Sequence, residues 1–208
     1  MYDAFAECLK AVANGRRLEL LELMAQGEHS VEELARLTGL AMTTTSNHLQ
    51  TLKRAGLVST RREGSTIFYR LGGDDVAELY AAAKRVAFGR HARARAELDA
   101  FMDQPVAQGP VIDPADVTSQ MYVIDVRPVA EYEAGHFPGA VSIPVDELDQ
   151  RLAQVPQGAQ VVLYCRGQLC RLAREAAVRL RAKGVDARAM DVGVVEWRAD
   201  RGADLELA

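Results

Sequence analysis

The sequence predicts two domains: a mainly α-helical domain that carries a β-hairpin, followed by an α/β domain with a parallel central sheet. At 208 residues the chain is long enough to form two hydrophobic cores. Helical patterns fill most of residues 1–102, and two β-rich arms lie within residues 57–71. An apolar run followed by a helical pattern over residues 161–183 is typical of a parallel sheet. We therefore place the second domain at residues 119–208 and a linker with three prolines at residues 103–118.

The composition is that of a water-soluble protein, and the sequence predicts a reducing compartment. Hydrophobic residues make up 49% of the chain and charged residues 26%. No apolar run approaches the ~20 residues of a membrane span, and the N-terminus lacks the layout of a signal peptide. We expect a cytoplasmic protein without membrane contact. Thiols stay reduced there, so the cysteines, Cys8, Cys165 and Cys170, are expected to be reactive rather than structural.

The first domain is predicted to hold four helices before its hairpin, over residues 2–13, 16–25, 30–38 and 42–55. Ser30 and Glu33 fit a capping box at the start of the third helix. Gly39 then makes a tight turn, and Gly56 ends the fourth helix. The arms of the hairpin are residues 57–61 and 66–71.

Helix, glycine turn, helix and a basic hairpin form the outline of a winged helix-turn-helix. The net charge is −4, but residues 41–70 hold five basic residues against one acidic residue. The helix over residues 42–55 is expected to present polar side chains to a major groove, and the hairpin tip to contact the phosphates or the minor groove. The alternative, a merely solvated polar face, stays open at this point. The predicted DNA-binding residues are Thr43, Thr44, Thr45, Ser46, Asn47, His48, Gln50, Lys53, Arg61 and Arg62.

Residues ~4–100 resemble the ArsR family of bacterial metal- and sulfur-responsive repressors. The resemblance rests on the runs VEELARLTGL, SNHLQTLKRAGLV and RREGSTIFYRL. It implies a homodimer that binds double-stranded DNA and pairs through its first and last helices. The last helix is predicted over residues 74–102, and its apolar stripe forms the dimer seam or packs on its own domain. No metal is expected, because the third helix has no cysteine pair and His91 stands alone in the last helix. Cys8 alone does not provide a sulfur-sensing thiol pair in this domain.

The chemical centre is predicted in the second domain, at Cys165. A buried strand over residues 161–164 delivers this cysteine to a turn at Gly167, and a helix follows over residues 171–183. The loop N–H groups of residues 166–171 are expected to converge on one point near the helix N-terminus, so that Cys165 ionises easily. Arg166 and Arg171 add positive charge for an anionic substrate. A buried, unreactive Cys165 remains the alternative from spacing alone.

Residues ~115–202 resemble the rhodanese family of sulfurtransferases. The matching signature is Asp125-x-Arg127, Glu131-Tyr132, the run from Gly135 to Ala140, and Ile143-Pro144. The resemblance implies a parallel-sheet domain in which Cys165 carries a persulfide. It departs from the family in its loop, where Cys170 stands at the usual place of an arginine, and in Val192-Gly193-Val194 before Trp197. The predicted catalytic residues are Asp125, Arg127, Cys165, Arg166, Gly167, Gln168, Leu169, Cys170 and Arg171.

Together these features predict a DNA-binding transcriptional regulator, a repressor, whose second domain senses or transfers sulfur. Its expected partners are DNA, a second copy of the chain, and a small sulfur-containing anion such as thiosulfate, polysulfide or persulfide; no cofactor is expected. Cys170 either closes a bond with Cys165 or only packs at the helix start. Two alternatives stay open: an active sulfurtransferase, and an arsenate reductase or phosphatase that uses the Cys-x5-Arg spacing of Cys165 and Arg171.

Overall fold

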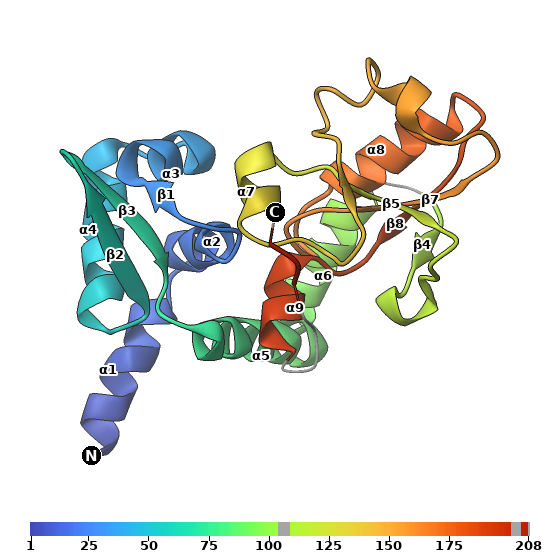
Figure 1. Cartoon of the computed structure of the whole chain (residues 1–208). Helices are drawn as coiled ribbons and strands as arrows, with labels where there is room; N and C mark the ends of the chain where they lie inside the picture. Colours follow the sequence, from blue (N-terminus) through green and yellow to red (C-terminus); the bar gives the residue numbers. More distant parts are fainter. Residues whose placement is uncertain (104–108, 201–204, 208) are drawn as a thin grey trace.

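The computed structural model describes residues 1–103, 109–200 and 205–207, and it consists of two domains in contact (Figure 1). The N-terminal domain confirms the hairpin and the four helices predicted before it. Its three-stranded antiparallel sheet has the order β1-β3-β2. Its elements are α1 (Tyr2–Val12), α2 (Gly15–Met24), β1 (His29–Ser30), α3 (Val31–Thr38), α4 (Met42–Arg54), β2 (Val58–Glu63), β3 (Thr66–Leu71), α5 (Asp74–Arg90) and α6 (Ala92–Met102).

Local caps explain where these helices begin and end. The Asn14 side chain accepts hydrogen bonds from the first backbone N–H groups of α2, and the Ser30 side chain accepts one from Glu33 N at the start of α3. Gly39 ends α3 in the left-handed conformation, with φ of 66°. This glycine places α4 directly after α3, so α4 lies where a DNA-reading helix is expected.

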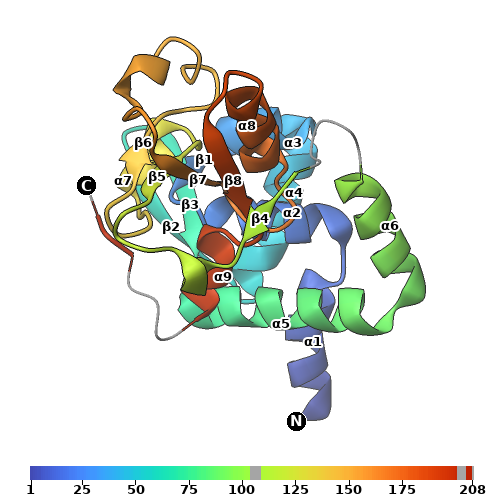
Figure 2. The ribbon, with the colours of Figure 1, turned by 90° about the vertical axis from the view of Figure 1, so that its right-hand side faces the viewer.

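The last helix of the domain differs from the prediction. Residues 74–102 were predicted as one helix, but the helix is interrupted at His91, whose φ of −105° and ψ of 106° are extended. The His91 side chain accepts a hydrogen bond from Ala94 N and so caps a second helix, α6. The break turns α6 back toward the C-terminal domain (Figure 2). Only α5 therefore extends the N-terminal domain, and α6 connects the two domains.

The C-terminal domain has a five-stranded parallel sheet in the order β4-β8-β7-β5-β6, which confirms the predicted α/β architecture. Strand β4 falls within residues 103–118, which were predicted as a linker; its pairing with β8 makes it part of the sheet. The elements are β4 (Val111–Ile112), η2 (Pro114–Asp116), β5 (Tyr122–Asp125), α7 (Val129–Glu133), β6 (Val141–Ser142), η3 (Leu152–Gln154), β7 (Gln160–Tyr164), α8 (Leu172–Arg181), β8 (Asp186–Met190) and α9 (Val194–Ala199).

The two cores are not fully separate. Apolar side chains of α2, α3, α4 and β3 form the N-terminal core, and the buried Val195 of α9 packs into it from the C-terminal domain. The sheet of the C-terminal domain is covered by α8 on one face, while Trp197 of α9 packs with Tyr164 on the other. Helix α9 is therefore shared between the domains, and it packs along α5.

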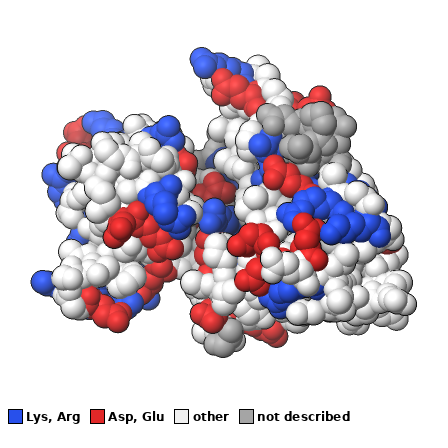
Figure 3. Space-filling view, turned by 90° about the horizontal axis from the view of Figure 1, so that it is seen from above, with Lys and Arg blue, Asp and Glu red and all other residues white. Residues whose placement is uncertain are grey.

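Charges of both signs are interspersed over the surface seen in Figure 3, which spans both domains. Among the described residues no helix is long and apolar enough to cross a membrane. The candidate functional regions are the loop after β7 and the exposed face of α4.

Candidate functional site

The loop after β7 lies at the carboxyl end of a central strand, where sites of parallel sheets usually form. Strand β7 ends at Tyr164, Cys165 follows directly, and α8 begins at Leu172. This confirms the predicted order of strand, short loop and helix. Gly167 is buried, and a Cβ there would lie 2.7 Å from Val195 of α9, so only glycine fits this close approach.

The two loop cysteines have opposite environments. Cys165 is buried, with 3% of its surface exposed. Its pKa is raised well above the ordinary value, first by desolvation and then by its hydrogen bond with Cys170. The prediction that Cys165 ionises easily is therefore wrong for this structure. Cys170 is partly exposed, and the hydrogen bond from Cys165 lowers the pKa of Cys170, with backbone N–H groups of Leu172 and Arg166 adding to the effect.

The backbone N–H groups of the loop do not converge on one open point as predicted. Gln168 N donates to Glu196 Oε1 at 3.4 Å, and Cys170 N donates to the Gly167 carbonyl at 2.9 Å. A carboxylate of α9 therefore takes part of the hydrogen-bonding capacity that an external anion would need. The loop is a closed turn in this structure rather than an open anion cradle.

The loop arginines are also engaged within the protein. Arg166 forms a two-pronged ion pair with Glu131 of α7, with Nη2 to Oε1 at 2.5 Å. The Arg171 guanidinium lies 4.5 Å from the ring centroid of Phe101 in α6, and its Nε lies 3.7 Å from Glu175 Oε1. Arg171 thus contacts the connecting helix. This placement disfavours the arsenate reductase or phosphatase alternative, which needs that arginine on a bound oxyanion.

Asp125 and Arg127 lie beneath the loop and are fully buried. Arg127 donates to both carboxylate oxygens of Asp125, and Asp125 Oδ2 also accepts from the Tyr164 hydroxyl at 2.7 Å. These bonds tie the end of β5 to the end of β7. The structure therefore brings the two predicted residues next to the loop, where they hold its base in position instead of facing a substrate.

Gln26, at the end of α2, was not predicted as a site residue, yet it joins the loop to the N-terminal domain. It is fully buried. Its Oε1 accepts from Arg127 Nη1 at 3.1 Å, and its Nε2 donates to the Arg166 carbonyl at 3.3 Å. The side chain thus contacts both the base of the loop and the loop itself. The neighbouring helix α2 packs on α3 and on α4, the predicted DNA-reading helix.

A buried ion pair makes the second connection. Lys84 of α5 pairs with Glu196 of α9, and their side chains are only 7% and 17% exposed. Glu196 also accepts from Gly193 N at 2.8 Å and from Gln168 N, so it links α5 to the cysteine loop. Glu22 lies on the same side, and burial is the main cause of its raised pKa. The cysteine loop, residues 165–171, is therefore covered by α2 and α5.

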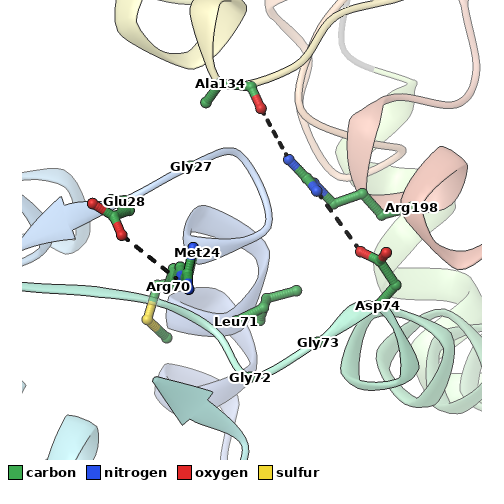
Figure 4. A pocket seen from close by; sticks show the side chains of 10 residues that line it. All are labelled: Met24, Gly27, Glu28, Arg70, Leu71, Gly72, Gly73, Asp74, Ala134 and Arg198. Atoms are coloured by element: carbon green, nitrogen blue, oxygen red, sulfur yellow. Dashed lines mark hydrogen bonds and ion pairs between the residues drawn. The ribbon is translucent and has the colours of Figure 1, made fainter. Parts of the chain in front are cut away.

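Arg198 of α9 makes the third connection, beside a cavity of about 400 Å³ between the domains (Figure 4). Its Nε donates to the Ala25 carbonyl at 2.6 Å and its Nη2 to the Ala134 carbonyl at 3.3 Å. Its Nη1 lies 3.7 Å from Asp74 Oδ1. One side chain thus contacts the end of α2, the end of α7 and the start of α5. The cavity is lined by Met24, Gly27, Glu28, Arg70, Leu71, Gly72, Gly73, Asp74, Ala134 and Arg198.

The predicted DNA-reading face of α4 is exposed, with one exception. Thr43, Thr44, Asn47 and Gln50 are exposed, and Ser46 and His48 are partly exposed. Thr45 is buried, and its hydroxyl donates to the Ala41 carbonyl at 3.2 Å. The prediction is therefore wrong for Thr45, because this residue lies on the core side of the helix.

The basic residues near the hairpin are partly held by other groups. Arg61 forms ion pairs with Glu28 and Glu63 and stacks over the Phe68 ring. Arg62 donates through Nε to the Gly64 carbonyl, and Lys53 Nζ donates to Thr60 Oγ1. All three are exposed. Arg62 has no carboxylate partner among the contacts of the described residues, so we expect it to carry more of the phosphate attraction than Arg61.

In the described part of the chain, no three His, Cys, Asp or Glu side chains are grouped as metal ligands would be.

Comparison with known proteins matches both domains. A family model described as "Bacterial regulatory protein, arsR family" matches residues 14–60, and one described as "Rhodanese-like domain" matches residues 105–200. The HTH-type transcriptional regulator Rv0324 of Mycobacterium tuberculosis is 41% identical over 201 residues, which cover 95% of this chain and 88% of that protein. The transcriptional activator HlyU of Vibrio cholerae is 46% identical over 68 residues, 33% of this chain and 63% of that protein.

A solved structure is similar to the N-terminal domain. It is the homodimeric winged helix-turn-helix DNA-binding domain of Mb0332 from Mycobacterium bovis, a possible ArsR-family regulator, at 49% identity. The match covers 44% of this chain and 85% of that one, with a TM-score of 0.42.

Proposed function

This chain belongs to the ArsR family of helix-turn-helix transcriptional regulators and carries a rhodanese-like domain, and we propose that the second domain is its sulfur sensor. The protein binds an operator as a homodimer and represses transcription. A small sulfur-containing anion, such as thiosulfate, polysulfide or a persulfide, delivers sulfur to the loop that holds Cys165 and Cys170. The modified loop then changes the affinity of the N-terminal domain for DNA.

The observation that carries this proposal is the direct contact between the cysteine loop and the DNA-binding domain. Gln26, two residues after the end of α2, bonds to the Arg166 carbonyl, and Lys84 of α5 pairs with Glu196, which itself accepts from Gln168 N. A loop that changes shape cannot keep all of these bonds. Because α2 packs on α3 and α4, the change reaches the elements that hold the reading helix.

Burial of the loop also favours sensing over turnover. A sulfurtransferase has to expose its persulfide to an external acceptor in each cycle. Here Cys165 is covered, and Glu196 occupies part of the loop's hydrogen bonding. Sulfur transfer therefore requires the cysteine loop, which bonds to Gln26 and Glu196, to rearrange. Such a requirement slows a catalyst, whereas in a sensor it is the signal.

The dimer is supported by an apolar face on α1. Tyr2, Phe5 and Leu9 are 83%, 62% and 39% exposed, and α1 extends away from the rest of the domain (Figure 1). Val86 of α5 is also exposed. Large apolar side chains in one patch are typical of an interface. The similar Mycobacterium bovis domain is described as homodimeric.

Fluorescence anisotropy on a DNA fragment from upstream of the gene, at a fixed salt concentration, tests the proposal. Polysulfide should raise the Kd of the wild-type protein by about tenfold or more, which needs a difference of about 1.4 kcal/mol between the two states. Cys165→Ser should bind with the wild-type Kd before treatment and keep it afterwards. Arsenate should have no effect on either protein.

The proposal fails if polysulfide modifies the thiols, as seen by mass spectrometry, while the Kd of the wild-type protein stays the same. Cys8→Ser is the matched control, because Cys8 lies in α1, far from the loop in the sequence, and packs against the N-terminal core. This variant should respond to polysulfide as the wild type does. A lost response in Cys8→Ser would place the sensing thiol in the DNA-binding domain.

A further inference from the structure

The loop contains two thiols in hydrogen-bond contact, and the structure distinguishes their roles. Cys165, at the start of the loop, is buried in the core of the C-terminal domain, among apolar side chains of the sheet and α8. Cys170, at the end of the loop, is partly exposed. A sulfur donor arriving from solvent therefore meets Cys170 first. The resemblance to sulfurtransferases implies that the first loop cysteine, Cys165, takes the sulfur. In this structure the more accessible cysteine is instead Cys170.

We propose that Cys170 is the thiol that first accepts sulfur and that Cys165 then resolves it into an intramolecular disulfide. This inference rests on the proposed function only in taking polysulfide as the donor. It assigns a modification site to Cys170, and it makes the pair a dithiol switch rather than a carrier of a stable persulfide.

The surroundings of Cys170 suit an attacking thiolate. The Cys165 thiol and the N–H groups of Leu172 and Arg166 donate to its sulfur, and they stabilise the charged form more than the neutral form. Helix α8, ten residues long, begins at Leu172, so its positive end faces the same sulfur. Cys170 thus combines access with ionisation, whereas Cys165 lacks both.

In the first step the Cys170 thiolate attacks a terminal sulfur of the polysulfide. A bond forms between Cys170 Sγ and that sulfur, and the neighbouring S–S bond of the polysulfide breaks. The shortened polysulfide leaves with the electron pair of the broken bond. Cys170 is then a persulfide, and the donor has been reduced by the same two electrons.

In the second step Cys165 attacks Cys170 Sγ and the outer sulfur leaves. The thiol proton of Cys165 passes to the departing sulfur, which is released as hydrogen sulfide. The product is a disulfide between Cys165 and Cys170: two thiols have been oxidised, and one sulfane sulfur has been reduced. No other oxidant is needed. The existing hydrogen bond between the two sulfurs already places the attacking and the attacked atoms together.

Closing this bond fixes the loop and removes the donor that Cys165 provides to Cys170. Gly167 lies between the two cysteines and accepts from Cys170 N at 2.9 Å. A disulfide requires a specific dihedral angle about its S–S bond, which two thiols in hydrogen-bond contact do not require. The loop backbone at Arg166, which bonds to Gln26 and Val195, is therefore the part expected to move.

The order of the two steps is tested on the reduced full-length chain with sodium tetrasulfide, quenched by iodoacetamide and read by mass spectrometry. The wild-type chain should lose the mass of two hydrogen atoms. Cys165→Ser should gain one sulfur atom, located on the peptide that carries Cys170. Cys170→Ser should react at Cys165 at least about tenfold more slowly, because that thiol is buried and protonated. Cys8→Ser should behave as the wild type.

The opposite pattern would overturn the inference: sulfur on Cys165 in the Cys170→Ser chain and none on Cys170 in the Cys165→Ser chain. A second measurement needs no variant. Wild-type protein treated briefly with limiting tetrasulfide should carry its first added sulfur on Cys170, and a first sulfur on Cys165 contradicts the proposal. Since neither readout involves DNA, a failure of the proposed function in the anisotropy experiment leaves this result interpretable by itself.

Discussion

Replacing Lys84 with methionine should loosen the domain interface at the cysteine loop and thereby expose Cys165 more often. Lys84 pairs with Glu196 across the two domains, and both side chains are largely buried. Methionine keeps the length and the apolar contacts of the lysine stem but removes its charge. The variant therefore changes the docking of α5 on α9, and it changes no residue of the cysteine loop.

The expected magnitude follows from the burial of the pair. Removing one member of a buried ion pair costs about 3–5 kcal/mol. Glu196 keeps the N–H groups of Gly193 and Gln168 as donors, so we take a smaller loss of about 2–3 kcal/mol from the domain interface. Because about 1.4 kcal/mol is tenfold in an equilibrium constant, the open state becomes about 30- to 150-fold more populated.

The rate at which iodoacetamide labels Cys165, followed by peptide-resolved mass spectrometry, measures that population. Lys84→Met should raise this rate by the same factor. The control is Arg93→Met, which removes an ion pair with Glu97 whose side chains are 83% and 66% exposed, and it should leave the rate nearly unchanged. If Lys84→Met lowers the free energy of unfolding while the labelling of Cys165 stays at the wild-type rate, the pair does not hold the interface closed.

Three further outcomes are expected. The rate of Cys170 alkylation in the wild-type chain should rise with pH with a midpoint below the ordinary thiol pKa, since the pKa of Cys170 is lowered and the thiolate reacts; a midpoint at or above the ordinary thiol pKa contradicts this. Gln26→Leu should lower the free energy of urea unfolding by about 2–4 kcal/mol, because Arg127 loses a buried acceptor, whereas Gln157→Leu on an exposed loop should change it by less than about 0.5 kcal/mol. Arg62→Ala should weaken binding to operator and unrelated DNA alike and reduce the salt slope by about 1; a loss confined to the operator would show base reading.

Features with a local cause were predictable from the sequence. Ser30 and Gly39 set the ends of α3 through a side-chain cap and a left-handed turn, and both signals lie within a few residues of the helix they end. The two β-rich arms and the intervening turn at Gly64, with φ of 59°, gave the hairpin in the same way. The order of β7, cysteine loop and α8 also followed from neighbouring residues.

Some errors had a signal that was available in the spacing. Thr45 stands four residues before Leu49 and seven before Leu52, so it shares their buried face of α4. A helical position count would have removed it from the DNA-binding residues. The break at His91 had a weaker signal, the Gly89 two residues earlier, and the capping bond to Ala94 N is what fixes it.

The covering of the loop had no signal in the sequence, because it depends on how two domains meet. Lys84 and Glu196 are 112 residues apart, and Gln26 is 140 residues from Arg166. Each of these residues is of an ordinary polar or charged type that the sequence alone does not mark as an interface residue. Only the docked structure shows that Gln26 and Glu196 bond to the loop at Arg166 and Gln168, whereas Cys165 itself is buried in the core of its own domain.

Contact between the loop and α2 also implies an effect in the opposite direction. If the state of the thiols changes the affinity for DNA by a certain factor, bound DNA must change the equilibrium between reduced and modified thiols by the same factor. Gln26 connects the two sites, because it bonds to Arg127 and to the Arg166 carbonyl and directly follows α2, the helix on which α3 and α4 pack. Operator-bound protein should therefore be harder to oxidise with polysulfide than free protein, and the same substitution at Gln26 should weaken both effects together. A sensor that worked through a flexible connection alone would show neither.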